Sequence, residues 1–157
     1  MRRMNTNFLR LFLLSMLGNF ANAKTLGTGN TFAAAKLTQK EVSQIIPALE
    51  QLAYDIPDSW NTELRAKRID LGSSAGLVLE GTNLLCGGTG NCQIFVFRRV
   101  NDRWISLFQG QAPICDAFTF GPGTMNGIKN LTVATNQSSE TVQRVTYQFD
   151  GQFYRSK

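Results

Sequence analysis

The sequence predicts an α+β fold, in which an N-terminal helical segment packs on a mainly antiparallel β-sheet built of hairpins. Three observations lead to this class. Apolar residues recur at helical spacing from residue 42 to residue 53. After residue 67, short β-prone runs alternate with turns that are rich in Gly and Asn. No internal repeat and no compositional break divides residues 37–157, so this stretch is expected to form a single domain.

Residues 1–23 have the features of a signal peptide. The segment begins with a basic front, has a short apolar centre at residues 11–17 and ends in Ala21-Asn22-Ala23, the small-x-small pattern that a signal peptidase recognises. The apolar centre is shorter than the roughly 20 residues that cross a bilayer. We therefore expect a periplasmic or secreted protein without a stable membrane anchor. Residues 24–36, rich in Gly, Thr and Ala, are expected to be a flexible lead-in.

A helix is predicted from residue 38 onwards. Thr38 and Glu41 have the spacing of a capping box, in which each side chain accepts a hydrogen bond from the backbone N–H of the other residue. The apolar stripe that follows consists of Val42, Ile45, Ile46, Leu49, Leu52 and Ala53. Pro47 interrupts this stripe and removes a helical hydrogen bond, so we expect either a kink or two short helices in tandem.

The remaining elements are predicted to be strands joined by tight turns. The β-prone runs are residues 68–71, 77–80, 93–99, 103–108, 118–120, 131–135 and 144–149. The turns between them include residues 72–76, Asn101-Asp102, Asn126-Gly127 and Asp150-Gly151. Residues 93–99 are apolar on both faces, which predicts a central strand. Residues 144–149 alternate between apolar and polar, as a half-buried strand does.

The most distinctive motif is Cys86-Gly87-Gly88-Thr89-Gly90-Asn91-Cys92. Glycine tolerates the backbone angles of a tight reversal, so this segment can bring the two sulfurs together, and an oxidising compartment would join them in a disulfide. A zinc site is the rival hypothesis, and it would also need Cys115 and a carboxylate. Cys115 is otherwise a buried inert thiol, a partner for another molecule, or a competitor for Cys86 or Cys92.

Charge and composition exclude several functions. The full chain has 16 basic and 11 acidic residues, but three of the basic ones lie in the signal segment, which leaves 13 against 11. This balance does not favour nucleic-acid binding. The dense basic cluster of Arg98, Arg99 and Arg103 is either a solvated hairpin end or an anion site. Because the sequence has no His, Ser-His-Asp and Cys-His catalysis are excluded. We expect no cofactor.

Carboxylates and tryptophans are the remaining candidates for chemistry. Asp70 and Glu80 would serve a glycosidase only if the two carboxyl groups faced one cleft. Trp60 lies in a polar stretch and is either packed against the sheet or exposed as a contact residue. Trp104 is a second aromatic residue suited to ligand binding.

Several motifs occur together between residues 67 and 155. They are Leu85-Cys86-Gly87, Gly90-Asn91-Cys92, residues 95–99 with Arg103-Trp104, Asn126-Gly127, residues 130–133 and the closing stretch from Tyr147 to Gly151 with Tyr154. Together they resemble small uncharacterised exported bacterial proteins, and this resemblance implies export and a disulfide hairpin. The end of the chain is also similar to single FG-GAP-type propeller blades, which usually carry an Asp-rich calcium loop. Residues 71–74 lack such acids, so we expect no calcium site.

These observations predict an exported, non-catalytic protein-binding domain, in concrete form an inhibitor or immunity protein of a cell-wall-acting enzyme. Its partner would be another protein, an envelope enzyme or a toxin. The predicted contact surface consists of Gly87, Gly88, Thr89, Gly90, Asn91, Arg98, Arg99, Arg103 and Trp60. The alternative is a periplasmic module that binds a small molecule or glycan through Trp60 or Trp104. A hydrolase that uses Asp70 and Glu80 is the third hypothesis.

Overall fold

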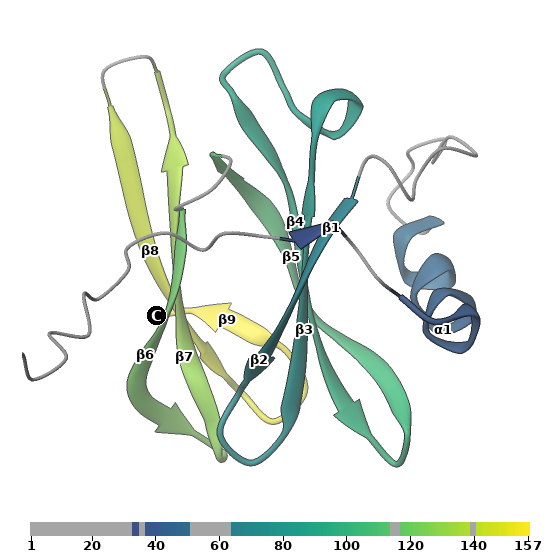
Figure 1. Cartoon of the computed structure of the whole chain (residues 1–157). Coiled ribbons are helices and arrows are strands. Elements are labelled where there is room, and N and C mark those ends of the chain that lie inside the picture. The colour runs from purple at the N-terminus through teal and green to yellow at the C-terminus, as the bar shows by residue number, and fades with distance from the viewer. Residues whose placement is uncertain (1–32, 35–36, 51–63, 114–116, 139–140) are drawn as a thin grey trace, which may run out of the picture.

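The computed structural model describes residues 33–34, 37–50, 64–113, 117–138 and 141–157. These residues form two antiparallel β-sheets and one short α-helix, arranged in three layers with the first sheet in the middle (Figure 1). The predicted α+β class is wrong. The chain has a β-rich fold, because the strands after residue 117 build a sheet of their own and the described residues contain one short α-helix.

The first sheet has the strand order β1-β2-β3-β4-β5. Its strands are β1 (Ala33–Ala34), β2 (Leu64–Asp70), β3 (Ala75–Gly81), β4 (Asn91–Val100) and β5 (Arg103–Pro113). β1 lies within residues 24–36, and the rest of that expected lead-in is outside the described residues, as is the signal segment. The predicted central strand is confirmed, since β4 pairs with β3 on one side and with β5 on the other.

The second sheet has the strand order β6-β7-β8-β9. Its strands are β6 (Phe118–Met125), β7 (Ile128–Asn136), β8 (Val142–Phe149) and β9 (Tyr154–Ser156). The four predicted turns each join neighbouring strands of one sheet. Asn101 and Asp102 both have positive φ angles (47° and 64°), as do Asn126 and Gly127 (50° and 77°), which suits the tight hairpins between β4 and β5 and between β6 and β7.

A hydrophobic cluster fills the space between the two sheets. Its members include Val78, Ile94, Val96, Leu107 and Phe108 from the first sheet, Leu71 between β2 and β3, and Phe118, Ile128, Leu131, Val133, Phe149 and Tyr154 from the second sheet. At one end the turns of the two sheets also meet through their backbones. Ser73 N donates to Gly127 O (2.9 Å), and Lys129 N donates to Leu71 O (2.8 Å). The sheets therefore form one sandwich with a shared core.

Helix α1 (Gln39–Glu50) covers the outer face of the first sheet (Figure 1). Ile45 and Leu49 share a second buried cluster with Leu64, Leu77, Leu79, Phe95, Phe97 and Trp104. The helix continues through Pro47 to Glu50 as a single element, so two helices in tandem do not form at this position. The stripe residues Leu52 and Ala53 lie outside the described residues.

Glu41 fastens the start of α1 to the sheet. The predicted capping box is present, because Thr38 N donates to Glu41 Oε2 (2.9 Å) and Glu41 N donates to Thr38 Oγ1 (3.3 Å). The same carboxylate pairs with the two terminal guanidinium nitrogens of Arg68 in β2 (2.8 and 3.0 Å). It also accepts a hydrogen bond from the Trp104 indole N–H (3.2 Å). The hydrogen bond from Arg68 is the main reason that the pKa of Glu41 falls from 4.5 to about 2.

We predict that replacing Glu41 with Gln destabilises the protein by about 1–2 kcal/mol at neutral pH. Because the folded-state pKa of about 2 lies below the ordinary 4.5, ionised Glu41 stabilises the native state above about pH 4.5. That contribution is lost as the pH falls towards 2. The unfolding free energies of wild type and Glu41→Gln, measured in urea, should therefore converge in acid. Glu50→Gln, at the exposed end of the same helix, is the control, and an equal effect there would contradict this role.

Candidate functional site

The disulfide between Cys86 and Cys92 is present, as the sequence predicts. The two cysteines also face each other in an isolated antiparallel bridge, so they close the base of the disulfide loop, residues 86–92. Inside the loop, Gly87 N donates to Asn91 O (2.7 Å) and Gly90 N donates to Gly87 O (2.9 Å). Gly90 has a φ of +77°, a value that L side chains rarely adopt. The reversal therefore depends on this glycine.

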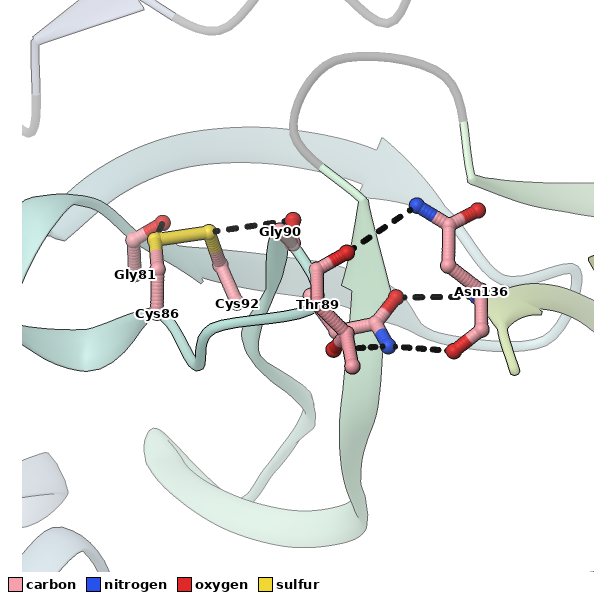
Figure 2. The surroundings of a disulfide bond; sticks show 7 residues. Gly81, Cys86, Thr89, Gly90, Cys92 and Asn136 are labelled. Carbon is pink, nitrogen blue, oxygen red and sulfur yellow. Dashed lines mark hydrogen bonds between the residues drawn. A yellow bond between two sulfur atoms is a disulfide. The ribbon is translucent and has the colours of Figure 1, made fainter. Parts of the chain in front are cut away.

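Asn91 ties the disulfide loop to the second sheet. Its Nδ2 donates to Thr89 Oγ1 (2.9 Å) and to Asn136 O (2.8 Å), and its Oδ1 accepts from Asn136 N (3.0 Å). Asn136 Nδ2 donates in turn to Thr89 O at 3.4 Å (Figure 2). The Asn91 amide thus pairs with the backbone at the end of β7, much as a neighbouring strand would. Asn91 is 4 % exposed, so it supports the loop as a buried residue at the base of the loop.

The tip of the loop, residues 87–90, is exposed to solvent. A Cβ atom placed on Gly88 or Gly90 would have no atom beyond its chain neighbours within 4 Å, so the space beside these two glycines is open, whereas Thr89 between them is hydrogen-bonded to Asn91 and Asn136. Leu84, in the 3-10 helix η1 (Asn83–Leu85) just before the loop, is 70 % exposed. The loop is consequently fixed at its base and open at its tip. Such preorganisation lowers the entropy lost when a partner binds.

The three predicted arginines lie far from the loop tip. Asn91 begins β4 opposite Pro113, whereas Arg99 lies near the other end of the strand, opposite Trp104. At about 3.3 Å per residue, an extended strand separates Asn91 and Arg99 by roughly 26 Å. The structure therefore divides the predicted contact surface into two places at opposite ends of β4.

Each of the arginines on β4 is engaged within the protein. The Arg98 guanidinium lies 4.9 Å from the centre of the Phe149 ring, where a cation is favourable. Arg99 lies 6.0 Å from the Trp104 ring and forms an ion pair with Asp102. A hydrogen bond from Lys40, followed by one from Arg99, lowers the pKa of Asp102 to about 2.

Two further residues from the sequence analysis, Trp60 and Cys115, lie outside the described residues. Arg103 is exposed at the start of β5. Trp104 is only 8 % exposed, and its indole N–H already donates to Glu41. It therefore does not offer an open face for stacking on a ligand.

A polar cavity of about 360 Å³ lies where α1 meets the β4–β5 hairpin. Its lining residues are Thr38, Lys40, Glu41, Gln44, Arg68, Arg99, Asp102 and Trp104. Gln44 Oε1 accepts from Trp104 N (3.0 Å), and Lys40 pairs with Asp102. These contacts fasten the helix to the hairpin and leave a charged hollow beside them.

The geometry opposes two hypotheses from the sequence, the hydrolase that uses Asp70 and Glu80 and the zinc site at the cysteines. Asp70 is paired with Ala75, so Glu80 lies five residues further along β3, roughly 17 Å away and beyond the ~9.5 Å limit for a glycosidase pair. Asp70 is also bound to Lys129 (2.9 Å), which lowers the pKa of Asp70. A zinc site that uses Cys86 and Cys92 is excluded in the oxidised protein, because both sulfurs belong to the disulfide.

No protein-family model matches this chain, and neither a curated protein nor a solved structure does. The resemblance to exported bacterial proteins therefore stays an expectation. Among the described residues, no helix is both long enough and apolar enough to cross a membrane.

Sequence reasoning missed two residues of the loop region. The exposure of Leu84 could have been suspected, because it lies in the short connection between β3 and the first cysteine of the motif. The role of Asn136 has no local signal, since its partner Asn91 lies 45 residues away in the sequence. In the sequence, Asn91 has only its place next to the motif's second cysteine to distinguish it.

We predict that Asn91→Ala destabilises the protein by about 2–4 kcal/mol. The substitution removes the hydrogen-bond partner of both the backbone N–H and the backbone C=O of Asn136. Chemical denaturation would measure the loss. Asn91→Asp keeps the acceptor for Asn136 N but places a buried carboxylate oxygen against Asn136 O, so it should destabilise the protein as well. An unchanged unfolding free energy in both variants would show that this pairing does not hold the loop.

Proposed function

We propose that this protein is an exported, non-catalytic protein-binding domain that inserts the tip of its disulfide loop into a cleft of another protein. An inhibitor or immunity protein of a cell-wall-acting enzyme is the concrete form of this proposal. The single observation that supports it best is a loop that is fixed at its base by the disulfide and by Asn91 while its tip is exposed.

The chemistry of the loop tip favours a narrow cleft as the complementary surface. Residues 87–90 are three glycines and a threonine, so the tip is slim and carries no charge. The exposed Leu84 beside the tip can enter an apolar pocket at the rim of such a cleft. A disulfide is also what an oxidising compartment would produce and maintain, which supports export.

We predict that Gly88→Arg abolishes partner binding and leaves the fold intact, because a Cβ added at Gly88 has open space within 4 Å and the exposed side chain would block the tip. The matched control is Gly121→Arg in β6, where an added Cβ also meets nothing within 4 Å. Oxidised wild-type protein, Gly88→Arg and Gly121→Arg would each be immobilised and exposed to envelope extract. Mass spectrometry would then quantify the retained proteins.

Wild type and Gly121→Arg should retain one enzyme or toxin in stoichiometric amount, and Gly88→Arg should lose it. Equal retention by all three would remove the loop tip from the contact surface. Retention of no protein by wild type would contradict a protein-binding function.

The polar cavity beside α1 favours a second candidate function, binding of a small molecule or glycan. If it operates, cell-wall fragments should change the fluorescence of Trp104, one of the lining residues. The chain has two tryptophans, so Trp60→Phe leaves Trp104 as the only reporter. Saturable quenching in Trp60→Phe that disappears in Trp60→Phe with Arg68→Ala would support this function. Unchanged fluorescence would eliminate the cavity as a site for such fragments.

A further inference from the structure

The polar cavity where α1 meets the β4–β5 hairpin has more cations than carboxylates in its lining. The cations are Lys40, Arg68 and Arg99, and the carboxylates are Glu41 and Asp102. Both carboxyl groups have a pKa of about 2, so they are ionised at neutral pH. The lining therefore has an excess of one positive charge.

Both carboxylates of the cavity are already paired with these cations. The two Glu41 oxygens face the two terminal nitrogens of Arg68, at 2.8 and 3.0 Å. The two Asp102 oxygens pair separately, one with Lys40 and the other with Arg99. In the described lining, every carboxylate oxygen thus has a donor, and the cavity has little capacity to bind a cation or a further donor.

The donors of the cavity, by contrast, are in surplus. A lysine has three N–H donors and an arginine has five. Within the described part of the chain, Lys40 and Arg99 each give one donor to Asp102. Their side chains are 66 % and 52 % exposed, so a ligand in the cavity can reach the remaining N–H groups. A ligand with acceptors and a negative charge complements this lining.

We infer that this cavity selects an acidic sugar, one that bears a single carboxylate, over a neutral sugar. The inference rests on the second candidate function, binding of a small molecule or glycan. The planar fork of the Arg99 guanidinium matches a carboxylate, and Lys40 adds a second cation beside it. A monocarboxylate balances the single excess charge, whereas a phosphate monoester, with a charge of about −1.5 to −2, exceeds it. The volume of about 360 Å³ lies within the range of small-molecule sites.

This site is separate from the proposed partner site. Arg99, in the cavity lining, is opposite Trp104 at one end of the β4–β5 pair, whereas Asn91, at the base of the disulfide loop, is opposite Pro113 at the other end. Binding of a sugar therefore leaves the loop tip exposed. Loss of sugar binding would leave the capture of a protein partner unaffected.

Isothermal titration calorimetry of the oxidised exported protein tests the inference with a matched pair of probes. N-acetylmuramic acid is N-acetylglucosamine with an added lactyl ether, which carries one carboxylate. At low salt the acidic sugar should bind roughly tenfold more tightly than the neutral one. Raising NaCl from about 50 mM to about 500 mM should weaken the binding of the acidic sugar alone, because salt screens exposed charges.

Two variants assign the preference to the cavity. Arg99→Gln should abolish the preference for N-acetylmuramic acid, and it leaves Asp102 paired with Lys40. Lys40→Gln should reduce the preference as well and serves if Arg99→Gln does not fold. The matched control is Arg144→Gln, which removes an exposed arginine from β8 and should leave both affinities unchanged.

Equal affinities for the two sugars would overturn the inference and leave the second candidate function standing. Tighter binding of N-acetylglucosamine 1-phosphate than of N-acetylmuramic acid would also overturn it, because the cavity would then favour a phosphate. A preference that neither Arg99→Gln nor Lys40→Gln changes would place the acidic site elsewhere and overturn the inference. Failure of all three sugars to bind would contradict the second candidate function and the inference together.

Discussion

Burial of both faces of β3 and β4 is the constraint on which the rest of this structure depends. On one face, Leu77 and Leu79 of β3 lie with the Phe side chains of β4 in the cluster under α1. On the other, Val78 lies with Ile94 and Val96 in the core between the sheets. Each such side chain is worth about 1.5–3 kcal/mol when it leaves water. A two-sided apolar layer is stable only with a cover on each side, and here the covers are the helix and the second sheet.

The strands and turns were largely predictable because their signals are local. Alternation along 144–149, the Asn-Gly turn at residue 126 and the two-sided apolar pattern at 93–99 all lie within a few residues of the element that they specify. Membership of a sheet is different. A half-buried strand has the same alternation whether it extends the first sheet or begins a second, so the division after residue 113 left no local signal. The two-sided pattern at 93–99 was the available clue, since one helix covers one face only.

The candidate site shows the same contrast between local and distant information. The Cys86–Cys92 pairing follows from close spacing and intervening glycines, whereas the support from Asn136 joins residues that are 45 positions apart. The separation of the loop from Arg98 and Arg99 was, however, within reach of the sequence. Once residues 93–99 are assigned to an extended strand, its two ends cannot share one compact surface.

The strand order in both sheets follows the order of the chain, so that every strand pairs with its neighbour in sequence. From β2 onwards each sheet can thus grow hairpin by hairpin through short loop closures, whereas the pairing of β1 with β2 across α1 and the docking of the sheets are the more distant steps. During synthesis the first sheet is complete before β6 exists. Until the last strands arrive, Val78, Ile94 and Val96 have no cover on their inner face, and in that interval the nascent chain is open to aggregation.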